Sequence, residues 1–355
     1  MNLATEVRPG ANRYAVGQNI LQDLPQYLEP FGKVAVVTGT ISYQIFSDYY
    51  KKELEYPVFR YNGSASREDA QRIADEIGEA DVILAIGGGR VLDTGKMVAE
   101  VMNIDAIMVP TLISNCAPFT PIVAVYHPDR TFREMGYMKK APYLTLVDYD
   151  FLLATPKDYF VAGIGDTVAK WYEIKGITEQ LPADEKTAYI RLGIASAKVI
   201  LDILLEDSIQ GIKDLENKQI TPAFGRVADA IVGLAGETGG FAAAYGRSAG
   251  AHAVHDGLSY LESTHDQLHG NKVAYGILVQ LAHTNEIDEI KKLQEFYQAT
   301  GLPTKLSQLN VTATDADSLK PCTDHAACAE ETFNMIDADI TAEQVYQAIQ
   351  VVESL

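Results

Sequence analysis

The sequence predicts an α/β fold in which a doubly wound, mainly parallel sheet forms the N-terminal domain and an all-α domain follows it. Two observations support this fold class. In the first 155 residues, short apolar runs alternate with helical patterns, and the runs are apolar at every position, which is typical of strands buried on both faces of a parallel sheet. Beyond residue 156, where Pro156 marks the boundary, only long helical patterns remain. We therefore expect domains over residues 1–155 and 156–355.

The individual elements follow in order along the chain. Apolar runs predict strands over residues 33–38, 56–61, 81–86, 106–109 and 143–147. Ile73, Ile77 and Ala80 recur at a spacing of three to four and predict a helix over residues 67–80, and a second helix is expected from Gly89 through Val101. The C-terminal helices are predicted over residues 188–205, 223–234, 271–283 and 342–352. In a doubly wound sheet, ligands bind beyond the carboxyl ends of the strands.

Composition excludes several classes of protein. A net charge of −19 argues against a nucleic-acid partner, because phosphates need a basic face. Three cysteines (Cys116, Cys322 and Cys328) are too few, and odd in number, to form a disulfide framework. The N-terminal residues lack a signal-peptide pattern, and no apolar stretch reaches the roughly 18 residues of a membrane span. We therefore expect a cytoplasmic protein without a membrane partner.

Three adjacent glycines, Gly87, Gly88 and Gly89, follow the predicted strand at 81–86 and precede a helix. Glycine there lets the backbone approach a phosphate, to which the helix N-terminus offers free N–H groups. An ordinary glycine-rich turn is the alternative, and we favour phosphate binding. The motif is not the GxGxxG fingerprint. Asp93 falls near the first turn of this helix, where it either contacts a cofactor or complements the helix dipole.

Four of the seven histidines lie between His252 and His269. His252 and His255 are three residues apart and share a helix face. Because histidine is the commonest metal ligand, this clustering indicates a metal site, although not all four side chains can be ligands. A catalytic divalent site usually has three protein ligands and an open position, and Asp166 is the candidate carboxylate. The residue pattern leaves a helix N-cap as an equal alternative for Asp166.

Six motifs, in order along almost the whole chain, resemble the iron-containing (group III) alcohol dehydrogenase superfamily, and specifically its glycerol dehydrogenase-like branch. They are NRYAVGQNIL, IGGGRVLDTGK, PTLISNCAP, AGIGDTVAKWYE, HAVHDGL and LHGNKVAYGILVQ. The resemblance implies an N-terminal nucleotide-binding domain and a helical domain that binds metal and carries catalysis. It also implies a metal-dependent NAD(P)(H) oxidoreductase that acts on a small carbonyl or alcohol substrate, and we expect a homo-oligomer.

By this resemblance, Asp166, His252 and His269 are the metal ligands, and His255 supports the site or handles a proton. The implied nucleotide contacts are Gly87, Gly88, Gly89, Asp93, Thr111, Ser114, Thr120, Ile122 and Tyr126. One Asp and two His ligands suit zinc, which we expect first, as well as iron(II) and nickel. Hydride passes to or from the nicotinamide, while the metal acts as a Lewis acid towards the substrate oxygen.

Three departures from the glycerol dehydrogenase pattern bear on the cofactor and substrate. Gly39 and Thr40 replace an acidic residue that binds the adenosine ribose, so we expect NADPH to be accepted at least as well as NADH. Cys116 replaces an aspartate that faces glycerol, and Lys170 replaces a threonine four residues after Asp166.

The combination of NCAP, GIGDTVAKWYE and HAVHDGL is more similar to hydroxycarboxylate dehydrogenases, which reduce 2-oxo acids. Lys170 is the expected partner of the substrate carboxylate, with Arg247, five residues before His252, as the alternative anchor. Solvation, or pairing with an acid such as Glu173, is the competing explanation for both cations. The alternative activity is that of a glycerol or vicinal-diol dehydrogenase. A lyase of the dehydroquinate synthase type and a purely structural metal are less favoured.

Overall fold

The computed structural model describes residues 7–355 of the chain. Most of these residues fall into two compact units, of which the first comprises Arg8–Pro156 and Asp214–Glu237 and the second comprises Lys157–Lys213 and Thr238–Leu355. The chain leaves the first unit after Pro156, returns to it at Asp214 and leaves it again after Glu237. The predicted division at residue 156 assigned residues 214–237 to the C-terminal domain, whereas here they belong to the first unit. The division into two continuous domains remains a prediction.

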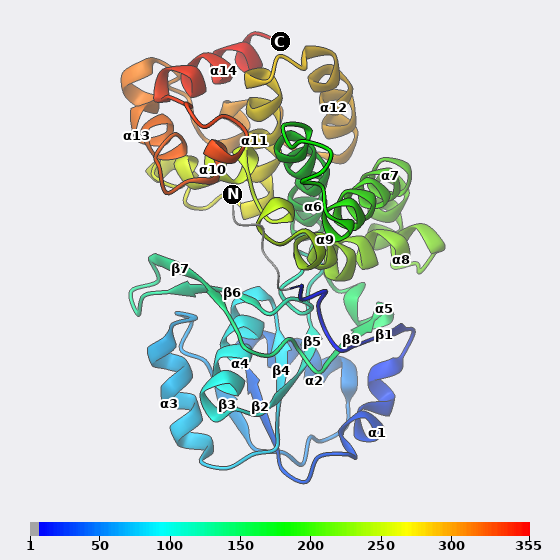
Figure 1. Ribbon diagram of the computed structural model, residues 1–355. Coiled ribbons are helices and arrows are strands. Elements are labelled where there is room, and N and C mark those ends of the chain that lie inside the picture. The colour runs from blue at the N-terminus through cyan, green and yellow to red at the C-terminus, as the bar shows by residue number, and fades with distance from the viewer. Residues whose placement is uncertain (1–6) are drawn as a thin grey trace. The chain divides into compact units, whose positions relative to one another are not determined.

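The first unit is built on a six-stranded parallel sheet with strand order β1-β8-β5-β4-β2-β3, which confirms the predicted fold class (Figure 1). A separate antiparallel hairpin pairs β6 with β7. The strands are β1 Arg13–Gly17, β2 Val34–Thr38, β3 Val58–Arg60, β4 Val82–Gly87, β5 Asp105–Pro110, β6 Ile122–Tyr126, β7 Phe132–Tyr137 and β8 Leu144–Asp148. All five predicted apolar runs form strands of this sheet.

Each face of the sheet has its own core, because successive strand residues point to opposite faces. Val34 and Val36 of β2 pack on one side, whereas Ala35 and Val37 pack on the other. The first face is covered by α1, α2 and α5, and the second by α3, α4 and part of β6. The helices of this unit are α1 Leu24–Leu28, α2 Thr40–Tyr50, α3 Arg67–Ile77, α4 Gly89–Met102, α5 Tyr149–Leu152 and α8 Pro222–Asp229.

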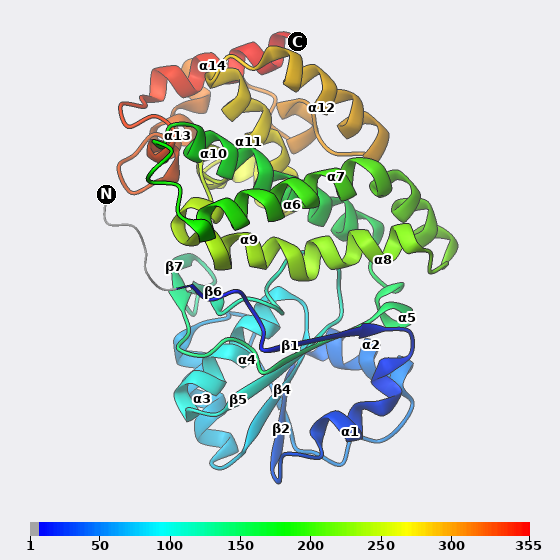
Figure 2. The ribbon, with the colours of Figure 1, turned by 45° about the vertical axis from the view of Figure 1, so that its right-hand side comes forward.

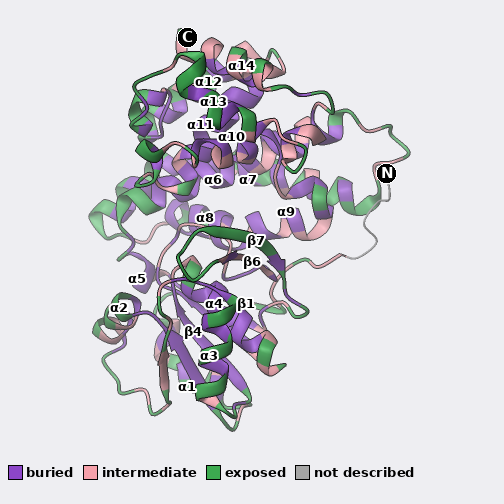
Figure 3. Cartoon of the chain, turned by 90° about the vertical axis from the view of Figure 1, so that its left-hand side faces the viewer, coloured by how far each residue is buried: buried purple, intermediate pink, exposed green. Residues whose placement is uncertain are grey.

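Three strands, β1, β6 and β7, were not predicted, and exposure explains two of them. β1 is an edge strand of partly exposed residues, and five of the six residues of β7 are exposed (Figure 3). An apolar run is the signature of a strand buried on both faces, which β1 and β7 are not. β6 is apolar at every position, so its sequence does carry this signature. The predicted helix over residues 223–234 is α8 followed by the π-helical turn Ala230–Leu234.

The second unit is helical, with no strand among its described residues (Figure 2). Helices α6, α10 and α11 pack on one another, and α13 and α14 pack on α10 and α11 respectively. The helices are α6 Lys157–Glu179, α7 Ala188–Asn217, α9 Ala235–Ala242, α10 Gly250–Leu258, α11 His269–His283, α12 Ile287–Thr300, α13 Ala316–Ala326 and α14 Ala342–Ser354; α7 and α9 each run across a unit boundary. No helix in residues 7–355 has the length and apolar character to cross a bilayer.

Glycines let the central helices of this unit approach each other closely. A Cβ at Gly270 of α11 would collide with the carbonyl oxygen of Ala162 of α6. A Cβ at Gly165 would lie 2.7 Å from the carbonyl oxygen of Gly270. The two helices therefore meet backbone to backbone beside Asp166 and His269, the neighbours of these glycines in sequence.

Candidate active site

Asp166, His252 and His269 come together from three helices of the second unit, α6, α10 and α11. The Nε2 atoms of His269 and His252 lie 3.2 Å and 3.4 Å from Oδ1 of Asp166. One ligand atom from each side chain falls within 4.8 Å of the other two, and among residues 7–355 this is the one group that could hold a metal ion in this way. The N-cap alternative for Asp166 is wrong, because Asp166 is the tenth residue of α6.

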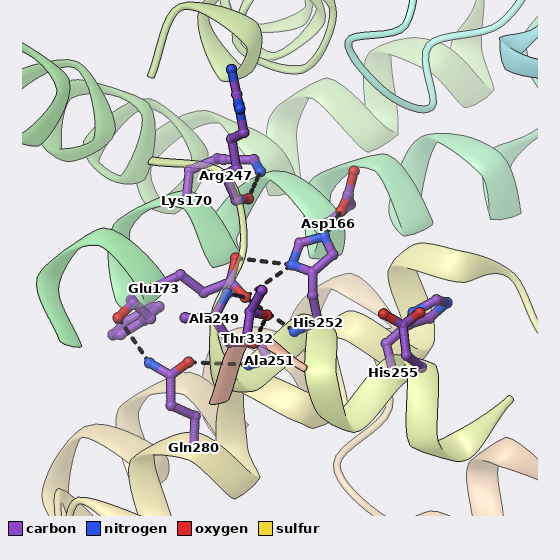
Figure 4. Close-up of polar contacts among 12 residues, drawn as sticks. Asp166, Lys170, Glu173, Arg247, Ala249, Ala251, His252, His255, Gln280 and Thr332 are labelled. Carbon is purple, nitrogen blue, oxygen red and sulfur yellow. Dashed lines mark hydrogen bonds and ion pairs between the residues drawn. The ribbon is translucent and has the colours of Figure 1, made fainter. Parts of the chain in front are cut away.

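Both imidazoles are oriented by a contact at their other nitrogen. Nδ1 of His252 lies 2.9 Å from each carboxylate oxygen of Glu173 (Figure 4). Nδ1 of His269 lies 2.9 Å from Nε2 of His255, whose own Nδ1 lies 2.8 Å from Asp256. With each Nδ1 donating to its partner, a cation that displaces the proton from Nε2 of His252 finds the Nε2 atoms of His252 and His269 beside Asp166. Metal-binding histidines in proteins are held in this way, with a partner at the second nitrogen.

The charges of the group depend on burial and on these contacts. Burial alone would lower the pKa of His252, but the Glu173 carboxylate and the hydrogen bond to Asp166 raise it to about 10. Burial and the neighbouring His269 lower the pKa of His255 to about 3, so His255 is neutral. Its Nε2 can therefore accept a hydrogen bond from Nδ1 of His269. Burial raises the pKa of Asp166, but the two histidines outweigh it and hold the value well below the usual range.

The donor set fits a divalent cation. A carboxylate oxygen and two imidazole nitrogens are the ligands that zinc and iron(II) accept. Asp166 and His252 are largely buried, whereas the side chain of His269 is 50% exposed, so the group opens to solvent on the His269 side. Three protein ligands with an open side match a catalytic site, whereas a structural zinc site closes with four.

The two predicted carboxylate anchors touch each other beside this group. Nζ of Lys170 donates to the backbone carbonyl of Arg247 at 2.7 Å (Figure 4). Arg247 precedes α10, so it does not share a helix with His252. Glu173 does not form an ion pair within 4.0 Å of Lys170 in the described chain, since its Oε1 accepts from the backbone N–H groups of Ala249 and His252.

The predicted nucleotide-binding residues lie in the first unit, around the junction of β4 and α4. Gly87 ends β4, Gly88 is the N-cap and Gly89 begins α4. A Cβ at Gly87 would collide with Val91, so the tight turn into α4 requires glycine. The N–H of Thr111, at the end of β5, donates to the carbonyl of Gly87 at 3.0 Å. The first N–H groups of α4 are thus presented at the carboxyl edge of the sheet, where an anion binds favourably.

Asp93 is buried and both of its carboxylate oxygens have partners in the protein. Oδ1 lies 2.9 Å from Nζ of Lys96, and Oδ2 accepts from the N–H of Ala124 at 3.1 Å. Burial raises the pKa of Asp93, and Lys96 opposes that shift. Lys96 also donates to the carbonyls of Ala117, Thr120 and Ile122. The pair therefore holds the segment that carries two predicted contacts, Thr120 and Ile122.

The remaining first-unit candidates lie on the segment between β5 and the end of β6 and at the start of α2. Ser114 and Cys116 are in the loop, and the carbonyl of Cys116 accepts from the N–H groups of Phe119 and Thr120. Tyr126 ends β6, and the guanidinium of Arg90 lies 5.0 Å from the centre of its ring. Gly39 is the N-cap of α2 and Thr40 its exposed first residue.

Comparisons with known proteins agree with this arrangement. Residues 11–149 match the family described as iron-containing alcohol dehydrogenase. Hydroxycarboxylate dehydrogenase A of Escherichia coli K12 is 36% identical over 83% of this chain and 81% of its own length. Glycerol dehydrogenase of Thermotoga maritima is 30% identical over 98% of this chain and 96% of its own length.

The chain belongs to the iron-containing alcohol dehydrogenase family. The structure of a probable glycerol dehydrogenase from Sinorhizobium meliloti 1021 superimposes with a TM-score of 0.87 at 27% identity, covering 99% of both chains. This alcohol dehydrogenase family member is therefore an NAD(P)-dependent oxidoreductase that acts on CH–OH groups of small molecules.

Four residues of this family member were not singled out from the sequence: Arg60, Arg90, Lys96 and Glu173. Glu173 follows Asp166 by seven residues, two helical turns, which places both on one face of α6. Lys96 follows Asp93 by three residues in α4, a spacing that pairs opposite charges. These two spacings could have been found in the sequence. Arg60 contacts Gly39 because β2 and β3 pair, and no sequence pattern near either residue predicts that contact.

Proposed function

We propose that this enzyme interconverts 2-oxo acids and 2-hydroxycarboxylates, using a divalent metal held by Asp166, His252 and His269. The observation that carries the substrate proposal is the position of Lys170. It lies one helical turn after Asp166 on α6, and its ammonium group donates to a neutral carbonyl. Glu173 attracts the ammonium group electrostatically, but the two do not form an ion pair within 4.0 Å among the described residues. A substrate carboxylate can therefore make a direct contact with this charge.

The residues of the helical unit have different proposed roles. Asp166, His252 and His269 hold the metal, and Glu173 and His255 fix the two imidazoles. Lys170 receives the carboxylate of the substrate, with Arg247 as a second cation beside it. The bound metal supplies Lewis acidity towards the substrate oxygen, and NAD(P)(H) supplies or accepts the hydride. Cys116 stands where the glycerol dehydrogenase pattern has an aspartate, so this chain lacks that negative charge.

The similarity to hydroxycarboxylate dehydrogenase A supports this choice, whereas the T. maritima and S. meliloti relatives favour a glycerol dehydrogenase, the second candidate. Members of the family use NAD(P) and a divalent metal. Zinc is the metal we propose to load first, with iron(II) and nickel as alternatives. We propose NADPH as a cofactor at least as good as NADH, because the turn Thr38–Gly39–Thr40 carries no carboxylate.

Lys170→Ala tests the substrate proposal. A hydrogen bond to a charged group contributes about 1.5–3 kcal/mol, so kcat/KM for 2-oxo acids should fall roughly ten- to a hundred-fold. Uncharged carbonyl substrates should lose much less. Lys175→Ala is the matched control, since Lys175 is on the same helix but pairs with Glu286. Equal losses for charged and neutral substrates would remove this role from Lys170 and transfer the test to Arg247.

A further inference from the structure

We infer that Arg60, at the carboxyl end of β3, binds the 2′-phosphate of NADP(H) and determines the preference for that cofactor. This inference rests on the proposed use of NADPH. It goes further, because Gly39 and Thr40 only remove an obstacle to the 2′-phosphate, whereas Arg60 supplies a positive charge to attract it.

Strand pairing places Arg60 at the turn from β2 to α2. β2 and β3 pair in parallel with Thr38 opposite Arg60, so both residues lie at the same edge of the sheet. Nη1 of Arg60 donates to the carbonyl oxygen of Gly39 at 2.8 Å. The guanidinium is therefore held against the turn whose sequence lacks the acidic residue that would bind a ribose hydroxyl.

The charge of Arg60 is not neutralised by the protein. In the part of the chain that the structure describes, no carboxylate lies within 4.0 Å of its guanidinium, and the first turn of α2 has no acidic residue. The guanidinium carbon Cζ of Arg60 lies 4.1 Å from the centre of the Tyr43 ring, so the ring packs against one face of the guanidinium. Arg60 is exposed, as is Thr40. Of the five guanidinium N–H donors, one is engaged by Gly39 and the others remain for an incoming anion.

The spacing of the strands suits a dinucleotide. The glycine turn after β4 is the candidate pyrophosphate site, and β2 lies between β4 and β3 in the sheet. Neighbouring strands are about 4.8 Å apart, so Arg60 is displaced roughly 10 Å across the sheet from that turn. In doubly wound folds the adenosine ribose is contacted at the end of the next strand, and a nearby arginine accommodates a 2′-phosphate. A planar guanidinium with parallel donors is the side chain that best matches phosphate oxygens.

Arg60→Gln tests the inference, with Lys33→Gln as the control. Lys33 is exposed at the amino end of β2, so its substitution removes the same charge at the opposite edge. For Arg60→Gln, KM for NADPH should rise roughly ten- to a hundred-fold, while KM for NADH and kcat at saturating NADPH change less than about twofold. Arg60→Lys keeps the positive charge but loses the planar pair of N–H donors, so its KM for NADPH should lie between those of the wild type and Arg60→Gln. Thr40→Glu should shift preference towards NADH.

A binding measurement separates this inference from the proposed reaction. Adenosine 2′,5′-bisphosphate should bind the wild type more tightly than 5′-AMP does, and Arg60→Gln should remove that difference. Equal loss of NADPH and NADH binding would show that Arg60 only stabilises the turn and would overturn the inference, as would an unchanged KM for NADPH. If the bisphosphate binds as expected but 2-oxo acids are not reduced, the substrate proposal fails and the inference about Arg60 stands.

Discussion

At the scale of single residues, the candidate metal ligands depend on side chains that do not reach the metal position. Glu173 contacts Nδ1 of His252 with both oxygens and also accepts from two backbone N–H groups at the start of α10. One carboxylate thus sets both the ring orientation of a ligand and the position of the helix that carries it. Partners of this kind increase the basicity of a metal-binding imidazole.

Glu173→Gln should therefore weaken metal binding about ten- to a hundred-fold. Glutamine keeps the shape and one acceptor oxygen for the backbone N–H groups, but it cannot accept from Nδ1 as a carboxylate does. Zinc affinity measured by competition with a chelator checks this. Glu179→Gln, an exposed position on the same helix, is the control and should bind zinc as the wild type does. Unchanged affinity in Glu173→Gln would show that the contact does not orient a ligand.

Lys96 and Asp93 form a buried pair in the first unit, with side chains 2% and 9% exposed. Removing one member leaves the other charge buried without its partner, which costs about 3–5 kcal/mol. Lys96→Met should lower the free energy of unfolding by that amount in urea denaturation, whereas Lys139→Met, whose side chain is 85% exposed, should change it little. A loss below about 1 kcal/mol would mean that the segment 117–124 is held by other contacts.

At the scale of elements, the approach of α6 and α11 brings Asp166 and His269 together. A methyl group at Gly270 cannot fit beside the carbonyl of Ala162 unless the helices separate. Gly270→Ala should cost at least the 1–3 kcal/mol typical of overpacking and should also weaken metal binding.

Gly176→Ala on α6 is the matched control for this substitution. Its added methyl would lie 3.0 Å from Cδ1 of Ile336 and 3.2 Å from Nε2 of Gln280, which are side-chain atoms rather than backbone, so we expect a smaller loss than at Gly270. Thermal unfolding and metal content of the two variants can be compared directly. Equal stability of Gly270→Ala and wild type would show that the close helix contact is not required.

The elements also show what a sequence can reveal. Strands such as β4, which is buried at every position, can be predicted from their apolar runs. The clustered histidines likewise predict the candidate metal site. β7 carries charged, exposed residues and has no such signal. The start of α6 was not predicted: an N-cap at Asp166, one of the two alternatives for that residue, would begin the helix at residue 167, ten residues after its observed start at Lys157. Contacts such as Arg60 with Gly39 join residues 21 apart through strand pairing, which no local pattern encodes.

At the scale of the whole molecule, the two kinds of site belong to different units. The glycine turn, Asp93 and Arg60 lie in the unit built on the parallel sheet, whereas the candidate metal ligands and Lys170 lie in the helical unit. By the proposed assignment, each unit carries the candidate residues for one requirement of a metal-assisted hydride transfer: a surface for the dinucleotide, and a site that polarises the substrate oxygen. Members of the iron-containing alcohol dehydrogenase family use both NAD(P) and a divalent metal.

The central claim is that the metal-loaded enzyme reduces 2-oxo acids. The most direct test is the kcat/KM for 2-oxobutanoate and for glycerol, measured with NADPH and NADP⁺ respectively, before and after metal removal. We expect efficient reduction of 2-oxobutanoate that is lost with the metal and regained on adding zinc, iron(II) or nickel. Alanine at Asp166, His252 or His269 should abolish both metal content and turnover. Efficient oxidation of glycerol with no reduction of 2-oxobutanoate, or full activity without metal, would contradict the account.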